Sequence, residues 1–317
     1  MKKPIVFMFS GQGAQYYNMG RELFLMDSAF RGWMKKLDEM YQDMTGESVI
    51  KVLYDEKRMK IEVFSRLRYT HPAIFILEYS IAKAVMERGI YPQYVLGASL
   101  GEFVSAAISG VMSCEDALEC VVKQAEAMEK HCENGGMLAI INDTKIFEEE
   151  PVLYQNSELV SVNYHSHFVV CGSLSGLEKI ERYLKAKVYV FQRLPVSYAF
   201  HSSMIDPAGF DFKEFIKTKP LSSPRVNFVS CLTGGREESV DYGYFWDVVR
   251  KPINFISAVK EIEKMGECIY IDMGPSGTLA NFAKYNLGSK SLTDIYSIIT
   301  PFNNEKNLIK LVEAVVV

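Results

Sequence analysis

The sequence predicts an α/β protein in which a domain built on a parallel sheet carries a smaller α+β domain as an insertion. Short apolar runs alternate with amphipathic stretches, which is typical of strands and helices that alternate in a parallel sheet. Between residues 137 and 194 the order changes to strand, helix, strand, strand, helix, strand, the split pattern of a ferredoxin-like domain. We therefore expect a large domain at residues 1–133 and 198–317, and a small one at residues 134–197.

The elements of the large domain follow from apolar runs, periodic patterns and helix-starting residues. Pro72 suits the first turn of a helix, and Ser113 with Asp116 three residues later resembles a capping box. We expect strands at 4–9, 94–96, 226–230 and 268–272, and helices from about 19, at 70–88, 102–110, 113–132 and 253–264, and from 278.

The small domain follows the glycine-rich segment 134–136, where the character of the sequence changes. Its apolar runs are short, and each is bounded by polar residues or glycine. We expect strands at 137–141, 159–163, 168–171 and 188–194, and helices at about 146–155 and at 175–185.

Composition excludes several classes of protein. The 317 residues are 48% hydrophobic and 23% charged, as in a soluble globular protein, and the net charge of −4 argues against a nucleic-acid binder. The apolar run 5–9 is too short for a signal peptide, and no stretch is long enough to span a membrane. Six dispersed cysteines without a C-x-x-C pattern indicate neither a disulfide framework nor a zinc site. We expect a cytoplasmic protein.

Segment 97–101 reads G-A-S-L-G and lies between a predicted strand and a predicted helix. This is the context that gives the G-x-S-x-G nucleophile elbow its meaning, because the sharp turn lifts the serine hydroxyl above the sheet edge. The helix N-terminus behind the serine directs free N–H groups towards an oxyanion that forms there. Ser99 is therefore the predicted nucleophile of an acyl-transferring or acyl-hydrolysing enzyme.

A serine nucleophile needs a base, and His201 is the best candidate among the five histidines. It lies where the inserted domain returns to the large one. Its imidazole would take the hydroxyl proton during attack and return it to the leaving thiol. The group that orients this imidazole stays open: Asp206 is close in sequence and fits a helix-starting residue better, and a backbone carbonyl is the alternative.

The loop after the first strand, residues 11–15, reads G-Q-G-A-Q. As a dinucleotide-binding fingerprint it fails, because Tyr16 stands at the third glycine position. Its better use is to bring the backbone N–H of Gln12 close to the elbow. Together with the N–H of Leu100 this predicts an oxyanion hole with two donors.

These motifs resemble those of the malonyl-CoA:acyl-carrier-protein transacylase family, which includes polyketide synthase acyltransferases, and the resemblance spans essentially the whole chain. Segment 9–15 matches F-x-G-Q-G-x-Q, segment 97–102 resembles G-H-S-L-G-E, segment 199–202 matches A-F-H-S, and segment 272–275 resembles E-x-G-P. The resemblance implies a hydrolase-like α/β domain with an inserted ferredoxin-like domain. It also implies a backbone carbonyl near Val248 as the partner of His201. The pocket residues that we expect are Gln124, Asn163, His71, Ala98, Tyr198, Phe200 and Met128.

The sequence departs from the family at two of these positions. Ala98 stands where the family has histidine, and Gln124 stands where malonyl-specific relatives have an arginine that pairs with the substrate carboxylate. Burying a carboxylate that has lost its charged partner costs about 3–5 kcal/mol, or two to three powers of ten in selectivity. Malonate should therefore be a poor substrate, unless another cation such as Arg193 or Arg250 reaches the pocket.

This departure resembles the acyl-hydrolase branch associated with polyketide synthases whose acyltransferases act in trans. The first hypothesis is a serine-dependent hydrolase that removes neutral acyl groups such as acetyl from acyl-carrier protein through an acyl-Ser99 intermediate. The alternative is a transacylase that loads malonyl extender units in trans. A catalytically silent docking module fits poorly with the Ser99, His201 and Gln12 set.

The predicted partners are acyl-carrier protein and acyl thioesters of coenzyme A or phosphopantetheine. We expect a monomer, with no cofactor of its own. His165 and His167 have the spacing of metal ligands, but they fall in a predicted hairpin turn without a third ligand, so no metal site is expected. His71 fits a pocket wall or a helix start equally well. The basic residues Lys179, Arg182, Lys185 and Lys187 fit a solvated helix face better than a carrier-protein contact.

Overall fold

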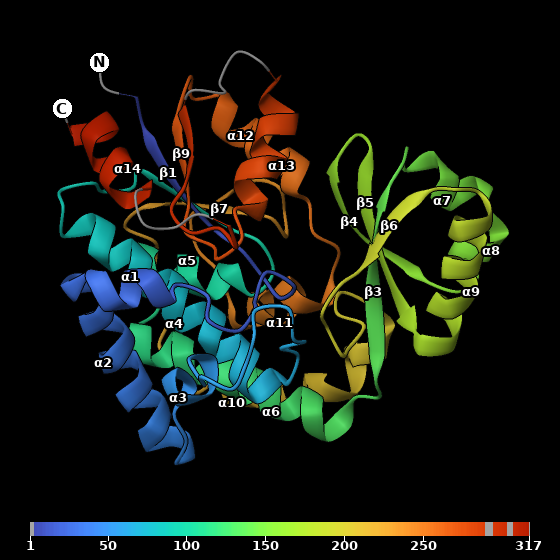
Figure 1. The fold of residues 1–317 in the computed structure, drawn as a ribbon, viewed down its shortest axis with the longest axis horizontal. Helices are drawn as coiled ribbons and strands as arrows, with labels where there is room; N and C mark the ends of the chain where they lie inside the picture. The colour runs from blue at the N-terminus through green and yellow to red at the C-terminus, as the bar shows by residue number, and fades with distance from the viewer. Residues whose placement is uncertain (1–2, 289–293, 303–306, 317) are drawn as a thin grey trace.

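The computed structural model describes residues 3–288, 294–302 and 307–316 and has two sheets, each with its own helices (Figure 1). No helix in these ranges is both long and apolar enough to cross a membrane. The strands are β1 (Ile5–Phe9), β2 (Tyr94–Gly97), β3 (Gly135–Ile141), β4 (Glu158–Tyr164), β5 (His167–Ser173), β6 (Val190–Arg193), β7 (Asn227–Ser230), β8 (Arg236–Glu237), β9 (Ile269–Asp272) and β10 (Ile295–Ser297). The helices are α1 (Arg21–Met26), α2 (Ser28–Thr45), α3 (Val49–Leu53), α4 (Leu67–Met86), α5 (Gly101–Ser109), α6 (Cys114–His131), α7 (Lys145–Glu149), α8 (Pro151–Tyr154), α9 (Leu174–Ala186), the 3₁₀ helix η1 (Ser203–Ala208), α10 (Gly209–Ile216), α11 (Tyr242–Arg250), α12 (Phe255–Glu263), α13 (Thr278–Leu287) and α14 (Asn307–Val316).

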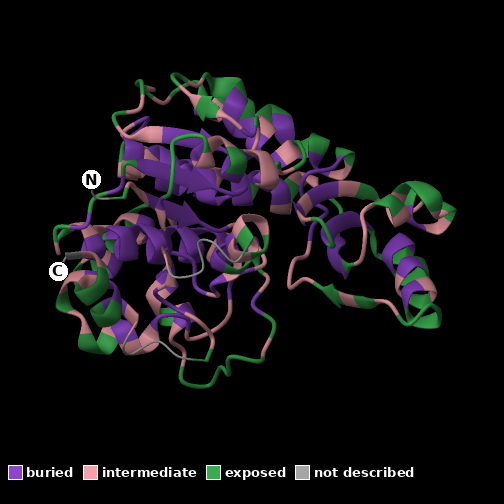
Figure 2. Cartoon of the chain, turned by 90° about the horizontal axis from the view of Figure 1, so that it is seen from above, coloured by how far each residue is buried: buried purple, intermediate pink, exposed green. Residues whose placement is uncertain are grey.

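The larger sheet has the strand order β10-β9-β1-β2-β7-β8, and all its pairs are parallel except β7 with β8. Its central strand β1 is buried on both faces: Phe7 and Phe9 join one apolar cluster, and Val6 and Met8 join the other. Figure 2 shows this buried layer inside a more exposed outer shell. A parallel sheet needs such cover on both faces, so the predicted fold class is confirmed.

The smaller sheet has the order β4-β5-β3-β6 and is antiparallel throughout. Helix α9 packs on one of its faces through Leu177, Ile180 and Leu184. Figure 1 shows this unit beside the larger sheet, with its opposite face towards the rest of the chain. The arrangement agrees with the predicted split pattern.

Helix α4 differs from the prediction because it begins at Leu67, so Pro72 lies inside the helix rather than in its first turn. A proline at this position cannot donate to the carbonyl four residues earlier, that of Arg68. The hydroxyl of Tyr41, on α2, donates to this carbonyl oxygen instead, at 2.8 Å. The packing of α2 on α4 therefore satisfies the acceptor that the proline leaves free.

Two predicted helices are each broken into two. The helix expected from residue 19 is divided at Asp27, whose side chain caps α2 through the N–H of Phe30, and the helix expected at 146–155 is divided before Pro151. The sequence analysis also missed several elements: α3, η1, α10, α11, α14, β8 and β10. Of these, α11 matters most for the site, because two carbonyl groups at its end contact His201.

Replacing Gly101 by alanine should lower the free energy of unfolding by more than about 3 kcal/mol, because close contacts in a packed core cannot relax. A Cβ at this position would lie 2.1 Å from the carbonyl oxygen of Phe9. Gly32 is the matched control: it is an exposed helical glycine, a Cβ there meets nothing within 4 Å, and Gly32→Ala should be neutral or stabilising. Urea unfolding of both variants measures the difference. Equal midpoints would contradict this account of the elbow.

Candidate active site

Ser99 lies on a sharp turn between β2 and α5, with a backbone φ of 56°. This left-handed conformation is strained for a residue other than glycine. The glycines on both sides allow the turn: a Cβ on Gly97 would lie 2.5 Å from the backbone of Glu102, and Gly101 approaches the end of β1 even more closely. The predicted nucleophile elbow is therefore present, and its serine is 9% exposed.

The imidazole of His201 contacts Ser99 directly. Its Nε2 lies 2.8 Å from Ser99 Oγ, and its Nδ1 lies 2.8 Å from the carbonyl oxygen of Lys251. Since a carbonyl oxygen can only accept, Nδ1 carries the proton, and Nε2 is left as the acceptor for the serine hydroxyl. This is the geometry that a general base requires.

The protonation state of His201 suits the same role. Burial lowers the pKa of His201 to about 4, and the hydrogen bond to Lys251 offsets only part of that shift. The imidazole is therefore neutral near pH 7 and can accept a proton. The backbone of His201 is also held, because its N–H donates to the carbonyl oxygen of Val249 at 2.9 Å.

The orienting group is a backbone carbonyl, as the resemblance implied, and it belongs to Lys251, three residues after Val248. Asp206 does not contact His201. Its carboxylate binds Arg250, with Oδ1 2.5 Å from Nε. No residue-type signal pointed to Lys251, because any residue type can supply a carbonyl oxygen.

The loop after β1 packs on the elbow. A Cβ on Gly11 would lie 2.9 Å from Ser99 Cβ and 3.3 Å from the nitrogen of Leu100. This close approach brings Gln12 to the side of Ser99, and within the described ranges neither the N–H of Gln12 nor that of Leu100 donates to another protein group. Both N–H groups therefore remain available to an oxyanion, as the predicted oxyanion hole requires.

A cavity of about 650 Å³ opens in front of Ser99, between the smaller sheet and the larger domain. Ser99, His201 and Gln12 lie on its wall together with residues of β3, β4 and β5 and of α13. Among the described residues that line it there is no lysine and no arginine. A substrate group in this cavity therefore meets no permanent positive charge.

The predicted pocket residues fall into two groups. Asn163, Ala98 and Phe200 line the cavity. The remaining four are buried but are not among the lining residues: Gln124, His71, Tyr198 and Met128.

The rings of His71 and Tyr198 pack against Phe200, with ring centroids 5.6 and 6.4 Å from it, respectively. The amide of Gln124 and both ring nitrogens of His71 have no hydrogen-bond partner in the described structure. Burial lowers the pKa of His71 to about 3, so this imidazole is neutral too. Uncharged polar groups therefore lie behind the cavity wall.

The two cations considered as substitutes for an arginine at position 124 are both engaged elsewhere. Arg193 binds Glu181 at 2.7 Å, Arg250 binds Asp206, and neither arginine lines the cavity. The basic residues of α9 are exposed, and the helix covers the face of the smaller sheet that is remote from the cavity.

Sequence analysis missed the aromatic part of one cavity wall, where β4 and β5 meet α13. Tyr164 stacks on Tyr285 of α13 with ring centroids 4.2 Å apart, and His167 lies 5.1 Å from Phe282. His165 is 89% exposed at its side chain and lies apart from this cluster of rings. No group of three possible metal ligands occurs among the described residues. Of the two histidines in the H-x-H pattern, it is the second, His167, that lines the cavity.

Behind the elbow, Glu102 joins α5 to β7 and α11. Its buried carboxyl group accepts hydrogen bonds from the hydroxyl of Tyr244 at 2.8 Å and from the N–H of Cys231 at 2.7 Å. Tyr244 lies on α11, and the end of that helix provides the carbonyl groups that hold His201. One side chain thus links the element that carries Ser99 to the element that holds its base.

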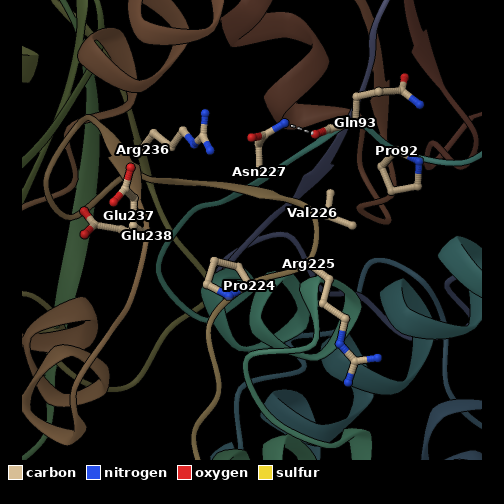
Figure 3. Close-up of a pocket in the computed structure, with 9 residues that line it drawn as sticks. All are labelled: Pro92, Gln93, Pro224, Arg225, Val226, Asn227, Arg236, Glu237 and Glu238. Carbon is tan, nitrogen blue, oxygen red and sulfur yellow. Dashed lines mark hydrogen bonds between the residues drawn. The ribbon is translucent and has the colours of Figure 1, made fainter.

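A second hollow, of about 500 Å³, lies at the opposite edge of the larger sheet, where β2 and β7 begin (Figure 3). Arg225, Arg236, Glu237 and Glu238 are among the residues around it, and Asn227 donates to the backbone of Gln93. It contains neither a serine nor a histidine, so it lacks the nucleophile and the base that the first cavity holds.

Comparison with known proteins shows the family to which the chain is similar. The acyl transferase domain family matches residues 6–311. The polyketide biosynthesis acyltransferase homolog BaeD of Bacillus velezensis is 47% identical over 99% of this chain and 97% of its own length. PksD of Bacillus subtilis, named in the same way, is 46% identical over 97% of this chain and 95% of its own length. The acyltransferase domain from the second module of the salinomycin polyketide synthase is 26% identical, with a TM-score of 0.85, over 98% of this chain and 72% of the solved one.

Glu102→Gln should become more stable relative to the parent protein as the pH rises from about 5 to about 8. Burial raises the pKa of Glu102 from 4.5 to about 8, so the folded protein keeps a proton that the unfolded chain releases. The parent protein therefore loses stability across this range, whereas glutamine has no such proton to lose.

Thermal unfolding midpoints of the two proteins at several pH values measure the effect. Glu62→Gln is the control, because Arg58 lowers the pKa of that half-buried carboxylate, so the folded protein does not retain a proton there as it does at Glu102. Parallel curves for Glu102→Gln and the parent protein would contradict the assignment.

Proposed function

The chain belongs to the acyl transferase domain family, and we propose that it releases neutral acyl groups, such as acetyl, from acyl-carrier protein thioesters in polyketide biosynthesis. The observation that carries this proposal is a cavity in which the described lining residues include no lysine or arginine, beside a serine and a neutral histidine in hydrogen-bond contact.

The reaction begins with attack of Ser99 Oγ on the thioester carbonyl carbon while Nε2 of His201 takes the hydroxyl proton. The negative charge on the carbonyl oxygen is stabilised by the N–H groups of Gln12 and Leu100. The C–S bond then breaks, and the thiolate leaves with the proton from His201. The acyl group remains as an ester on Ser99.

Water then hydrolyses the acyl-Ser99 ester, and His201 again acts first as base and then as acid. Nε2 of His201 takes a proton from the attacking water, and the new tetrahedral centre forms in the same oxyanion hole. As the ester bond breaks, His201 returns the proton to Ser99 Oγ. The free acid and the unmodified enzyme result, and the proton count balances without any further reactant.

The choice of a neutral acyl group rests on electrostatics. The free carboxylate of a malonyl group would enter the cavity without a charged partner, at a cost of about 3–5 kcal/mol. Arg193 and Arg250, which might have supplied the charge, are engaged in ion pairs away from the cavity wall. Acetyl and other uncharged groups avoid this cost.

The direct test incubates the protein with acetyl-loaded and with malonyl-loaded carrier protein and measures the products by mass spectrometry. We expect free acetate and regenerated carrier thiol, with the malonyl thioester turned over at least about a hundredfold more slowly. Ser99→Ala is the control and should form no acyl-enzyme. Net loading of malonyl groups from malonyl-CoA onto the carrier protein would establish the transacylase alternative instead.

Gln124→Arg should shift preference towards malonyl thioesters by about tenfold or more, since a guanidinium pairs with a carboxylate through two hydrogen bonds. The amide of Gln124 has no partner to lose, so the substitution removes no hydrogen bond. Gln124→Met is the control. Its side chain is similar in length and carries no charge, so a shift seen with arginine but not with methionine is due to the charge. The ratio of kcat/KM values for acetyl and malonyl thioesters is the readout. An unchanged ratio would locate carboxylate selection elsewhere.

A further inference from the structure

A buried carboxyl group lies behind the loop that carries one of the two predicted oxyanion donors. Glu78, on α4, is fully buried and does not line the cavity. A carboxyl group in such a place is costly unless it is paired or hydrogen-bonded. The steps assigned to Ser99 and His201 make no use of it, so its place in the core needs another explanation.

The partner of Glu78 is Ser10, which joins β1 to the loop. Glu78 Oε1 accepts two hydrogen bonds from Ser10, one from the backbone N–H at 2.9 Å and one from the hydroxyl at 2.5 Å. Gln12, at the other end of this short loop, carries the N–H that faces the oxyanion. One carboxyl oxygen therefore fixes both the backbone and the side chain of the residue that leads into the oxyanion hole.

A second contact joins the same helix to the loop. The side-chain nitrogen Nε2 of Gln12 donates to the hydroxyl oxygen of Thr70 at 2.9 Å. Thr70 and Glu78 lie about two turns apart on α4, which puts them along one side of the helix. The helix thus holds the loop at Ser10 and at Gln12, and Gly11 packs on the elbow between them.

The turn after β9 packs on Ser10 as well. A Cβ on Gly274 would lie 2.5 Å from Ser10 Oγ, and the N–H of Gly274 donates to Asp272 at 2.8 Å. The carboxyl group of Asp272 also accepts a hydrogen bond from the N–H of Ala280, at 2.8 Å. This packing leaves little room for Ser10 to move away from Glu78.

The surroundings of Glu78 favour its neutral form. Burial raises the pKa of Glu78 well above its usual value, and the nearby carboxyl group of Asp272 raises it further. Since Oε1 accepts both bonds from Ser10, the proton lies on Oε2, which has no hydrogen-bond partner in the described structure. A neutral acceptor suits this place, because a buried negative charge behind the loop would oppose the charge that develops on the oxyanion.

We propose that Glu78 and Thr70 are positioning residues that hold the backbone N–H of Gln12 towards the oxyanion, with Glu78 serving as an uncharged acceptor for Ser10. Neither residue lines the cavity, so both act through the loop. The inference rests on the proposed function in one step, the acylation of Ser99. It holds whether the acyl group is then passed to water or to a thiol.

The test measures acylation of Ser99 in single turnovers, by intact mass, over a range of acetyl-CoA and of malonyl-CoA concentrations. Each series gives a maximal rate constant, a half-saturating concentration and an amplitude. A loss of folded protein lowers the amplitude alone, whereas a displaced oxyanion donor lowers the rate constant and leaves the half-saturating concentration unchanged. A preference for malonyl-CoA would overturn the proposed function, and the variants would still be compared with the better substrate.

Glu78→Leu removes the acceptor and should lower the maximal rate constant about tenfold to a hundredfold, somewhat less than the loss of an oxyanion donor itself. Glu78→Gln keeps an uncharged acceptor and should keep the parent rate constant. Thr70→Val leaves the buried carboxyl group in place and should lower the rate constant about threefold to tenfold, the effect of one lost hydrogen bond.

Asp38→Leu is the matched control. Asp38 is a buried carboxylate that accepts a hydrogen bond from the N–H of Ile50 at 3.0 Å, at the start of α3 and not in the loop. Its loss destabilises the fold without touching the oxyanion donors, so any effect should fall on the amplitude alone.

The rate constants decide the assignment. Lower values in Glu78→Leu and Thr70→Val, with unchanged values in Glu78→Gln and Asp38→Leu, support it. An unchanged rate constant in Thr70→Val, equal losses in Glu78→Gln and Glu78→Leu, or a loss in Asp38→Leu as large as that in Glu78→Leu would each overturn the proposal. If Glu78→Leu does not fold, Thr70→Val and Glu78→Gln decide by the same criteria.

Discussion

The hydrogen bond from Nδ1 of His201 to the carbonyl oxygen of Lys251 is the interaction on which the site depends. It fixes the tautomer, and the tautomer decides whether Nε2 accepts or donates towards Ser99. A backbone carbonyl carries no formal charge, so it orients the imidazole without stabilising the imidazolium as strongly as a carboxylate would. Burial then keeps the pKa of His201 low. The base is neutral and ready to accept a proton near pH 7.

Close backbone packing sustains this arrangement. Gly11, Gly97 and Gly101 allow the loop after β1, the strand β2 and the helix α5 to meet at distances that a Cβ would prevent. The strained φ values of Ser99 and His201 persist because these surroundings leave no room for relaxation. Glu102 then ties the elbow to α11 through Tyr244, so the nucleophile and its base are positioned by one connected set of contacts.

Much of this could be predicted from the sequence, and the reasons are physical. Ser99 and His201 lie in motifs whose residue types are required by the turn and by the chemistry, and the central strands are apolar runs with clear boundaries. The role of Lys251 could not be predicted, because it is that of a backbone atom. The start of α4 before Pro72 depends on Tyr41, a tertiary contact that helix propensity does not contain. The stack of Tyr164 on Tyr285 joins segments that are distant in the sequence, and only the fold brings them together.

The most direct test of the central claim begins with the acetyl-Ser99 enzyme, isolated and placed in water labelled with oxygen-18 in the presence of excess pantetheine. If His201 activates water in a cavity adapted to neutral acyl groups, most of the acetyl group will leave as acetate that carries one labelled oxygen. If most of it leaves as acetyl-pantetheine and little label enters acetate, the enzyme transfers acyl groups to thiols, and the hydrolytic account is wrong.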